Sequence, residues 1–265
     1  ALVAGRLFRI PVIIHESDSH PGRVNLWSGK FAKRIALSYP EATKYFPQGK
    51  TAVTGNPLRQ DILIPTTNGA YEYLRLDKEL PIIFVIGGSQ GAKHINDIVV
   101  DLLPELLTKY QIIHQVGKAN YADITLRANF ILKDSPLAER YKAFDYLDST
   151  ALRMTAGVAS LVITRAGSAL FEIANWNLPA IIIPIPEEIS HDQRTNAFTY
   201  ARSGGAVVVE EKNLTKSILL SEINRIMSDD KLREEMRAGA KKFARPDAST
   251  VIAKELLKIS LEHED

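Results

Sequence analysis

Short apolar runs alternate with segments of helical periodicity along most of the chain. The runs are nearly all apolar rather than apolar at every second position, which predicts parallel strands with both faces of the sheet covered. The expected strands are Pro11–His15, Arg34–Ser38, Thr51–Thr54, Ile82–Ile86, Gln111–Gln115, Leu161–Thr164, Ala180–Pro184 and Ala206–Val209. The expected helices are Val24–Ala32, Ala92–Leu107, Asn120–Leu132, Ala151–Val158, Ser168–Trp176, Asp192–Ser203 and Lys216–Met227. This alternation predicts a doubly wound α/β fold.

A polar connector divides the pattern in two. Prolines and a glycine interrupt the periodicity between Gly55 and Ile82, and such residues are typical of a connecting loop. We therefore expect two Rossmann-like units, residues 1–61 and 62–246. Because only the first few expected strands precede the connector, too few for a doubly wound domain, the first unit is expected to be incomplete.

The two ends of the chain carry further expectations. Residues 1–9 read as the second half of a helix and lack an initiator Met, from which we expect an N-terminal truncation. Near the other end, a helix is predicted over Ala248–Leu261, and we expect residues 247–265 to pack back on the first unit. The apolar residues of this helix are predicted to form one stripe, made of Val251, Ile252, Leu256, Leu257 and Leu261.

Composition excludes several classes of protein. The 265 residues carry a formal net charge of only +2, which gives no support for nucleic acid as a main partner. Cysteine is absent, so disulfides and thiolate metal sites are excluded. No apolar run approaches the ~20 residues that a membrane-spanning helix needs. The chain is therefore expected to be a globular cytoplasmic protein.

The turn Gly87–Ala92 joins a buried strand to a helix. Such a turn presents unpaired N–H groups and the positive end of the helix dipole, which suit a phosphate or diphosphate. It lacks both the G-x-G-x-x-G spacing and the Lys of a P-loop, and a tight turn without a ligand is the alternative interpretation. Asn96 lies two helical turns after Ser89 on the same face, so both are expected to line one groove.

A second strand, turn and helix follow at Leu161–Ala174. Glu172 is placed to accept two hydrogen bonds from a ribose diol. Alternatively, Glu172 only complements the helix dipole. Two helix N-termini beside one pocket fit a diphosphate better than either does alone.

Two polar loops complete the set of candidate segments. His15-Glu16 follows the first strand and superficially resembles a zinc-protease motif, but the second histidine is five residues on and the segment is a loop. Strand and helix capping by His15 and Asp18 is the plain alternative. Gln193 and Asn196 share a helix face and suit sugar hydroxyls, or else they only cap the helix.

Taken together and in this order, these segments resemble the MurG family of bacterial N-acetylglucosaminyltransferases. The resemblance covers nearly the whole chain. It rests on His15-Glu16, Pro21-Gly22, Asn25, Gly55–Arg59, Gly87–Ala92, His114–Gly117, Arg165–Gly167, Gln193 and Asn196-Ala197. It implies the GT-B glycosyltransferase fold, in which two Rossmann-like domains face each other across a cleft. The first would bind the acceptor and the second UDP-N-acetylglucosamine.

The resemblance also implies roles for particular residues. Ser89, Gln90 and Gly91 would contact the diphosphate, Arg59 and Glu172 the nucleotide and its ribose, Leu147 the uracil through its backbone, and Gln193 the sugar. The remaining substrate-binding residues would be Asp18, Arg165, Gly167, Ser168 and Asn196. The catalytic group near the acceptor would comprise His15, Glu16, Asn25 and Asn96. The chain departs from the family at Asp18, where many relatives have Asn, and over Arg165–Glu172, which is one residue shorter than usual.

The implied reaction is inverting transfer of N-acetylglucosamine to the 4-hydroxyl of lipid-linked N-acetylmuramoyl-pentapeptide, the lipid I to lipid II step of peptidoglycan synthesis. No metal or other cofactor is expected. The family's N-terminal glycine loop, with its histidine, has no counterpart in this sequence. A donor-binding protein without turnover, and a nucleotide-sugar enzyme with another acceptor or epimerase activity, remain as alternatives.

The acceptor implied by the resemblance is linked to undecaprenyl pyrophosphate. The protein is therefore expected to act as a peripheral protein at the cytoplasmic face of the plasma membrane. Trp27, Lys30, Phe31, Lys33 and Arg34 mix aromatic and cationic groups and are a candidate lipid-facing patch. The alternative interpretation is a helix packing face with solvated cations.

Overall fold

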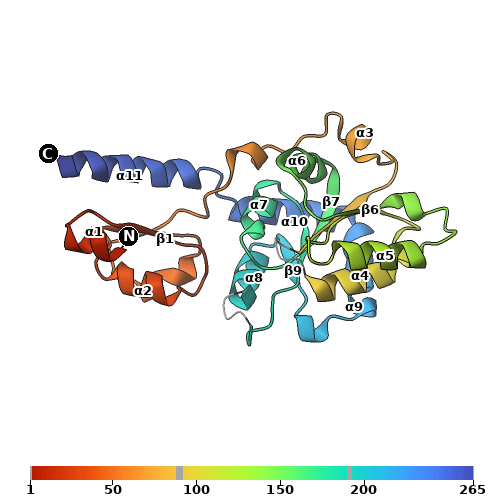
Figure 1. Ribbon diagram of the computed structural model, residues 1–265, viewed down its shortest axis with the longest axis horizontal. Helices are drawn as coiled ribbons and strands as arrows, with labels where there is room; N and C mark the ends of the chain where they lie inside the picture. The colour runs from red at the N-terminus through yellow and green to blue at the C-terminus, as the bar shows by residue number, and fades with distance from the viewer. Residues whose placement is uncertain (1, 88–91, 190–192, 265) are drawn as a thin grey trace.

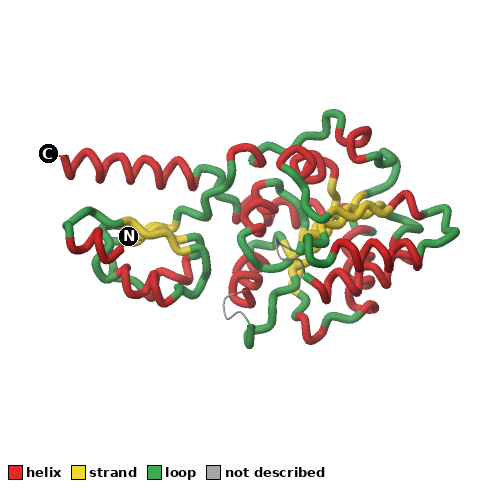
Figure 2. The backbone as a smooth tube through the Cα atoms, in the orientation of Figure 1, coloured by secondary structure: helices red, strands yellow, loops and turns green. Residues whose placement is uncertain are grey.

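Two parallel sheets form the framework of the protein (Figures 1 and 2). The computed structural model describes residues 2–87, 92–189 and 193–264. The first sheet has three strands in the order β1-β2-β3, which are Ile13–Glu16, Arg34–Leu37 and Thr51–Val53. The second has six strands in the order β6-β5-β4-β7-β8-β9. All their pairings are parallel, so the predicted α/β class is confirmed.

The strand order of the second sheet shows at which edge a ligand is expected to bind. Its strands are β4 (Ile82–Ile86), β5 (Gln111–Gln115), β6 (Tyr141–Phe144), β7 (Ala159–Thr164), β8 (Ala180–Ile182) and β9 (Ala206–Val208). The chain runs outward from β4 to β6, then returns to place β7 on the other side of β4. The connections leaving β4 and β7 therefore diverge. Doubly wound sheets bind ligands at this switch point, outside the carboxyl ends of the strands.

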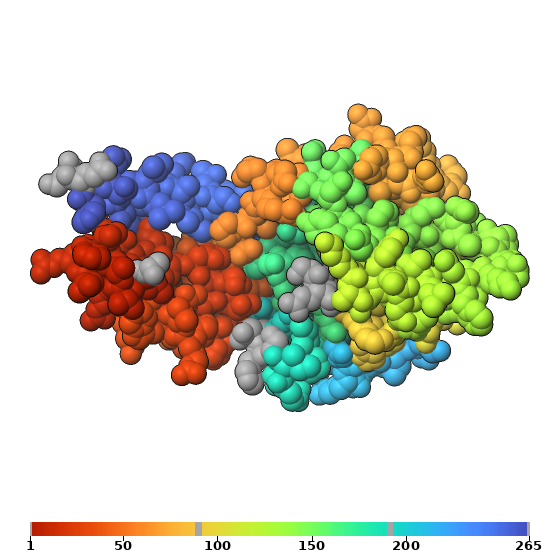
Figure 3. Space-filling view, in the orientation of Figure 1, coloured from red at the N-terminus to blue at the C-terminus, as the bar shows by residue number. Residues whose placement is uncertain are grey.

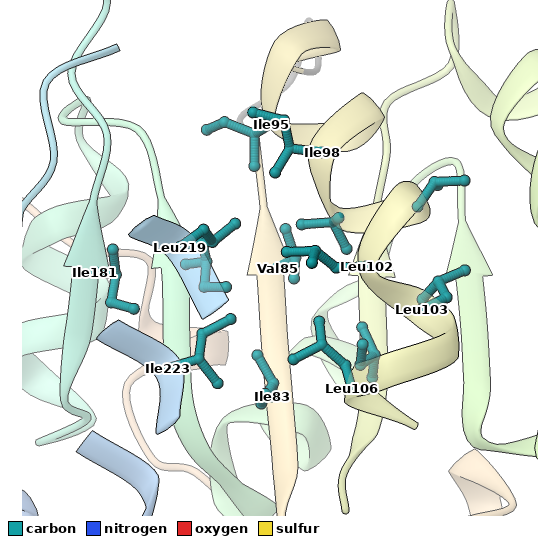
Figure 4. Packing of buried hydrophobic residues seen from close by; sticks show 14 of the residues in the cluster. Ile83, Val85, Ile95, Ile98, Leu102, Leu103, Leu106, Ile181, Leu219 and Ile223 are labelled. Carbon is teal, nitrogen blue, oxygen red and sulfur yellow. The ribbon is translucent and has the colours of Figure 1, made fainter. Parts of the chain in front are cut away.

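Helices cover both faces of the second sheet. Ile83 and Val85 of β4 pack with the helices of one face, while Phe84 between them packs with those of the other. Figure 4 shows the first of these layers, with Leu102 near β4. Burial on both faces explains why the strands are apolar without alternation.

The helices of the two layers have the following bounds. The first layer contains α4 (Lys93–Leu106), α5 (Tyr121–Ile131) and α9 (Lys216–Met227). The second contains α3 (Ala70–Leu74), α6 (Ser149–Val158), α7 (Ala169–Asn175), α8 (Gln193–Arg202) and α10 (Asp230–Phe243). Short 3₁₀ turns lie at η2 (Gln60–Ile62), η3 (Ala138–Arg140) and η4 (Glu211–Asn213).

The sequence pattern missed β6, α3 and α10. Strand β6 is an edge strand whose side chains are only half buried, so it has no apolar run. In α10, the buried residues are Met236, Gly239 and Ala240, and two of these are too small to give an apolar signal. Small residues are needed there, because a Cβ on Gly239 would lie 2.3 Å from the carbonyl carbon of Gly204.

The first sheet belongs to a smaller unit that also contains α1 (Leu2–Leu7), α2 (Arg23–Gly29) and η1 (Pro40–Tyr45). The connector after β3 joins it to the second unit, where the Trp176 indole N–H donates to the carbonyl of Ile62 at 2.8 Å. From Ile62 onward the connector thus packs with the second sheet.

Helix α11 (Ala248–Glu264) returns to the first unit. It lies beside that unit in Figure 3, and its Glu262 and Glu255 pair with Lys33 and Arg34, both at 2.9 Å. The apolar stripe predicted for this helix is not its buried face, because Leu261 is 65% exposed whereas Ile259 is buried. The predicted stripe is thus largely exposed, and the ion pairs of Glu255 and Glu262 contribute to the attachment of the helix.

Candidate functional site

A pocket of about 480 Å³ opens at the carboxyl ends of β4, β7 and β8. Its lining comes from both strand-to-helix corners and from the start of α8, and includes Gly87, Ala92, Lys93, Thr164, Arg165, Gly167, Ser168, Ile185, Gln193 and Glu211. The two corners that the sequence singled out therefore border one pocket, at the switch point of the sheet. Ser89, Gln90 and Gly91 lie outside the described residues.

Gln193 is held so that its amide nitrogen remains available. Its Oε1 accepts hydrogen bonds from the backbone N–H groups of Ala166 and Ile185, both at 3.2 Å. Two donors on one atom identify that atom as the oxygen and fix the orientation of the amide. Within the described chain Nε2 makes no hydrogen bond, so its two hydrogens are available to a ligand.

The turn after β7 leaves space for a ligand. A Cβ on Gly167 would meet no atom within 4 Å, so packing against the described protein does not require this glycine. The Ser168 side chain makes no capping hydrogen bond to α7. Both residues line the pocket, and the serine hydroxyl is free to bind a ligand there.

Arg165 lines the pocket but is committed to protein partners. Its guanidinium donates to the carbonyl of Ile183 at 3.1 Å and to the carboxylate of Glu211. Glu211 also faces His94 Nδ1 at 3.1 Å. Burial acts to raise the pKa of Glu211, but the hydrogen bonds and charges of Arg165 and His94 outweigh it and lower that pKa.

Sequence reasoning missed Glu211, although the acidic pair Glu210-Glu211 directly after the predicted strand Ala206–Val209 was a usable signal. A second cation, Lys93, also borders the pocket and pairs with Asp97 at 3.1 Å.

The residues expected at the nucleotide lie around α7 and after β6. Burial raises the pKa of the Glu172 carboxyl, with Arg59 acting in the opposite direction, so these two side chains are within electrostatic range. No described residue donates a hydrogen bond to the Glu172 carboxylate, which leaves it free for a diol. The buried Leu147 donates its backbone N–H to Gln115 Oε1 at 2.9 Å. The Leu147 carbonyl accepts no hydrogen bond from the described residues, so it is the backbone group of Leu147 that is available to a uracil.

Glu16 and Asn25 hold the loop after β1. The buried Glu16 carboxylate accepts from the backbone N–H groups of Asp18 at 3.0 Å and Gly22 at 3.2 Å, and from Asn25 Nδ2 at 2.9 Å. With three donors on its two oxygens, Glu16 orders the loop, and its lone pairs are largely used for that purpose.

His15, in β1 beside this loop, has one ring nitrogen with hydrogen-bond contacts to described residues. Its Nε2 lies 3.2 Å from the Gly55 carbonyl and 3.1 Å from Ser38 Oγ. Because a carbonyl can only accept, Nε2 carries the hydrogen and Nδ1 keeps the lone pair. Burial lowers the pKa of His15 despite the opposing effects of the Gly55 carbonyl and Glu16, which favours the neutral imidazole that a general base requires.

Asn96 lies buried inside the second unit. It is fully buried, its Nδ2 donates to the Val116 carbonyl at 3.0 Å, and its Oδ1 lies 3.0 Å from His114 Nε2. The expectation that Asn96 lines a groove is therefore corrected, because both polar atoms of its amide are used inside the second unit.

Asn196 is likewise bonded within the chain. Its Nδ2 donates to Asp18 Oδ1 and its Oδ1 accepts from the Ser19 N–H, both at 2.9 Å. Asp18 and Asn196, both expected to bind substrate, thus bind each other and join the two units.

Neither a metal cluster nor a membrane-spanning helix is found in the described part of the chain. No group of three or more His, Cys, Asp or Glu side chains among those residues is placed to hold a metal ion. None of the helices formed by residues 2–87, 92–189 and 193–264 has both the length and the apolar character needed to cross a bilayer.

Two parallel sheets, with a pocket at the switch point of the second, define a protein of the GT-B fold. Residues 82–252 match the model of the glycosyltransferase family 28 C-terminal domain. The chain is 34% identical, over 95% of its length and 68% of the relative's, to a UDP-N-acetylglucosamine–N-acetylmuramyl-(pentapeptide) pyrophosphoryl-undecaprenol N-acetylglucosamine transferase 2 of Bacillus thuringiensis. It is 36% identical to the enzyme of the same kind from Lachnospira eligens, over 83% of this chain and 60% of that one.

Solved structures agree with this result. The crystal structure of Acinetobacter baumannii MurG aligns with a TM-score of 0.76 and 26% identity, covering 97% of this chain and 69% of that one. A putative UDP-N-acetylglucosamine 2-epimerase from Listeria monocytogenes aligns with a TM-score of 0.71 at 15% identity, covering 100% and 72%. This second likeness shows the fold alone. The chain belongs to glycosyltransferase family 28 and, within it, to the MurG family.

Proposed function

We propose that the protein transfers N-acetylglucosamine from UDP-N-acetylglucosamine to the 4-hydroxyl of lipid-linked N-acetylmuramoyl-pentapeptide, converting lipid I to lipid II. Membership of the MurG family supports the reaction class. The names of the relatives contain both the donor, UDP-N-acetylglucosamine, and the undecaprenol-linked acceptor. The chain spans 68% and 60% of the lengths of the two relatives described. The observation that carries the proposal is the switch-point pocket, with the amide nitrogen of Gln193 directed to a ligand.

In this proposal residues 62–246 bind the donor. The diphosphate lies between the corners at Gly87–Ala92 and Gly167–Ser168, where the start of α4 supplies N–H groups without intrahelical partners. Glu172 receives the ribose hydroxyls, with Arg59 beside it, and the Leu147 carbonyl faces the uracil. Gln193 donates to a sugar hydroxyl. Residues 1–61 bind the acceptor.

The proposed chemistry is a single displacement with inversion. The acceptor oxygen attacks the anomeric carbon from the face opposite UDP, the bond from that carbon to the phosphate oxygen breaks, and UDP leaves with the electron pair. A base removes the hydroxyl proton, and we propose His15 Nδ1, whose lone pair and lowered pKa suit that role. Hydrogen bonds to the diphosphate stabilise the charge that develops on the leaving group.

A transfer assay tests this function. The protein at its natural length is incubated with radiolabelled UDP-N-acetylglucosamine and a lipid I analogue, and label is expected in a disaccharide-lipid product. Binding of the donor without transfer would instead identify a donor-binding protein. Conversion of the donor to its C2 epimer would identify an epimerase.

We further propose that the first unit docks on an anionic membrane surface through an apolar patch on α1 and α2. Val3, Val24 and Trp27 line one shallow hollow between these helices. Leu7 and Phe8, at the end of α1, are exposed as well, Phe8 to 70% and Trp27 to 43%. Arg23 borders the same surface. Of the cations suggested by the sequence, Lys33 and Arg34 instead pair with α11. Exposed aromatic residues next to cations are typical of interfacial membrane contacts.

Replacing Phe8 and Trp27 together by Ser is expected to weaken binding to phosphatidylglycerol vesicles at least about tenfold, since two large apolar side chains no longer enter the lipid. Vesicle cosedimentation measures the effect. Phe130→Ser is the matched control, because Phe130 is 81% exposed but lies on α5 of the second unit. Equal losses in both proteins would contradict the docking surface.

A further inference from the structure

Helix α8 is attached at both ends to different parts of the molecule. Its first residue, Gln193, lies at the pocket of the second unit. Further along, Asn196, Thr199 and Arg202 bind residues of the first unit. These four positions follow each other at intervals of three, so they form one continuous row on the helix surface. One rigid element therefore connects the pocket to the first unit.

The far end of the row is held by one carboxylate. Glu41, at the start of η1 beyond β2, accepts from Thr199 Oγ1 at 2.8 Å and from the guanidinium of Arg202 on the same oxygen. Arg202 also donates to Thr199 Oγ1 at 2.9 Å. The contact is partly exposed, and exposed ion pairs are individually weak. It therefore fixes a relative position more than it contributes to stability.

Aromatic rings of the two units pack together next to the Glu41–Arg202 contact. Tyr39, just beyond β2, lies 5.2 Å from the ring of Phe171 and 5.9 Å from that of Phe243. Phe171 directly precedes Glu172 on α7, and Tyr200 of α8 packs on Phe243 at 4.8 Å. The first unit therefore contacts both α8, which carries Gln193, and α7, which carries Glu172.

The junction also contains buried polar atoms without partners. Among the described residues, Glu41 Oε2, Ser19 Oγ and the Tyr200 hydroxyl are buried and make no hydrogen bond. Buried polar groups are normally satisfied, and each exception requires an explanation. Buried atoms without partners weaken the junction, so its relative position depends on the hydrogen bonds and ion pair that are formed there.

We propose that Glu41 and Arg202 are positioning residues for the transfer reaction, which hold the acceptor-binding unit on α8 so that acceptor and donor meet at the correct separation. This inference rests on the proposed function. The pair touches no reacting atom and acts through α8. Because small errors in the placement of reactants cost much of the rate, loss of the pair slows transfer without weakening donor binding.

Steady-state transfer kinetics of the protein at its natural length test the inference. Glu41→Gln and Arg202→Met are each expected to lower kcat about tenfold, with the donor KM and the calorimetric Kd for UDP unchanged within about twofold. Arg202→Lys keeps the charge and is expected to retain most of kcat. The double variant Glu41→Gln/Arg202→Met is expected to be no slower than either single variant, since both remove the same contact.

Glu222→Gln is the matched control, because Glu222 pairs with Arg225 at 2.7 Å on α9, away from the junction. It is expected to leave kcat unchanged. Unchanged kcat in Glu41→Gln, a parallel loss of UDP affinity, or multiplied losses in the double variant would each overturn the inference. Absence of transfer by the wild-type protein would instead refute the proposed function.

Discussion

Gln193→Glu is expected to lower the affinity for UDP-N-acetylglucosamine about 100-fold while the protein stays folded. Glutamate keeps an oxygen for the N–H groups of Ala166 and Ile185, which Gln193 Oε1 accepts at 3.2 Å each. The change removes the N–H donor directed to the ligand and places a negative charge beside a diphosphate. A lost hydrogen bond together with charge repulsion is worth roughly 3 kcal/mol, which corresponds to that loss of affinity.

Calorimetric titration with UDP-N-acetylglucosamine measures the effect, and thermal unfolding reports on the fold. Gln48→Glu makes the same chemical change at an exposed position outside the pocket and is expected to leave both measurements unchanged. Gln193→Met removes both functions of the amide, so it is expected to lower the melting temperature as well. Unaltered donor affinity in Gln193→Glu would remove this residue from the site.

Acidification from pH 7 to pH 5 is expected to destabilise the protein by about 2 kcal/mol through His114 alone. His114 is fully buried, and burial lowers its pKa to about 3. The unfolded chain binds a proton near pH 6.5 and the folded one does not, so stability is full above that pH and falls as the pH decreases. Continued to pH 3, the loss reaches about 4 to 5 kcal/mol.

The hydrogen bonds of His114 explain why it stays neutral. Asn96 Oδ1 accepts, since Nδ2 of that amide donates to the Val116 carbonyl, so His114 Nε2 carries the hydrogen and donates at 3.0 Å. Nδ1 then accepts from the Tyr141 hydroxyl at 3.0 Å. A second proton on Nδ1 would end its role as acceptor for the Tyr141 hydroxyl and place a positive charge in the core.

Denaturant unfolding at pH 7 and pH 5 tests the prediction. His114→Gln is expected to remove about 2 kcal/mol of the difference between the two pH values, whatever its stability at pH 7. His263→Gln, at an exposed position near the end of α11, is expected to keep the full difference. An unchanged pH dependence in His114→Gln would show that this histidine is protonated in the folded state.

The sequence predicted best those elements that are buried and bounded by turn residues. The bounds of β4 and β5 match the prediction, because both strands are buried throughout and turns limit them. The edge strand β6 and the small-residue helix α10 were missed, because their packing depends on tertiary neighbours and not on an apolar run. In α11, most of the apolar residues at helical spacing are exposed to solvent, so an apolar stripe in the sequence did not identify a buried face.

The site was predictable at the level of segments. Both strand-to-helix corners and Gln193 meet at one pocket, as strand order and turn position together indicated. Individual polar residues were less predictable, since an amide that binds a ligand and one that binds backbone look identical in sequence. Asn96 and Asn196 form hydrogen bonds within the chain, to partners 18 or more residues away in the sequence.

A crystal structure with UDP-N-acetylglucosamine tests the central claim most directly. The diphosphate is predicted to lie between Gly87 and Gly167, with Gln193 Nε2 hydrogen bonded to the sugar. The competing position is the pocket of about 510 Å³ between the three-stranded sheet and α11, lined by residues such as Ile35 and Val251. Nucleotide bound there, with the switch-point pocket empty, would contradict the assignment of the donor site.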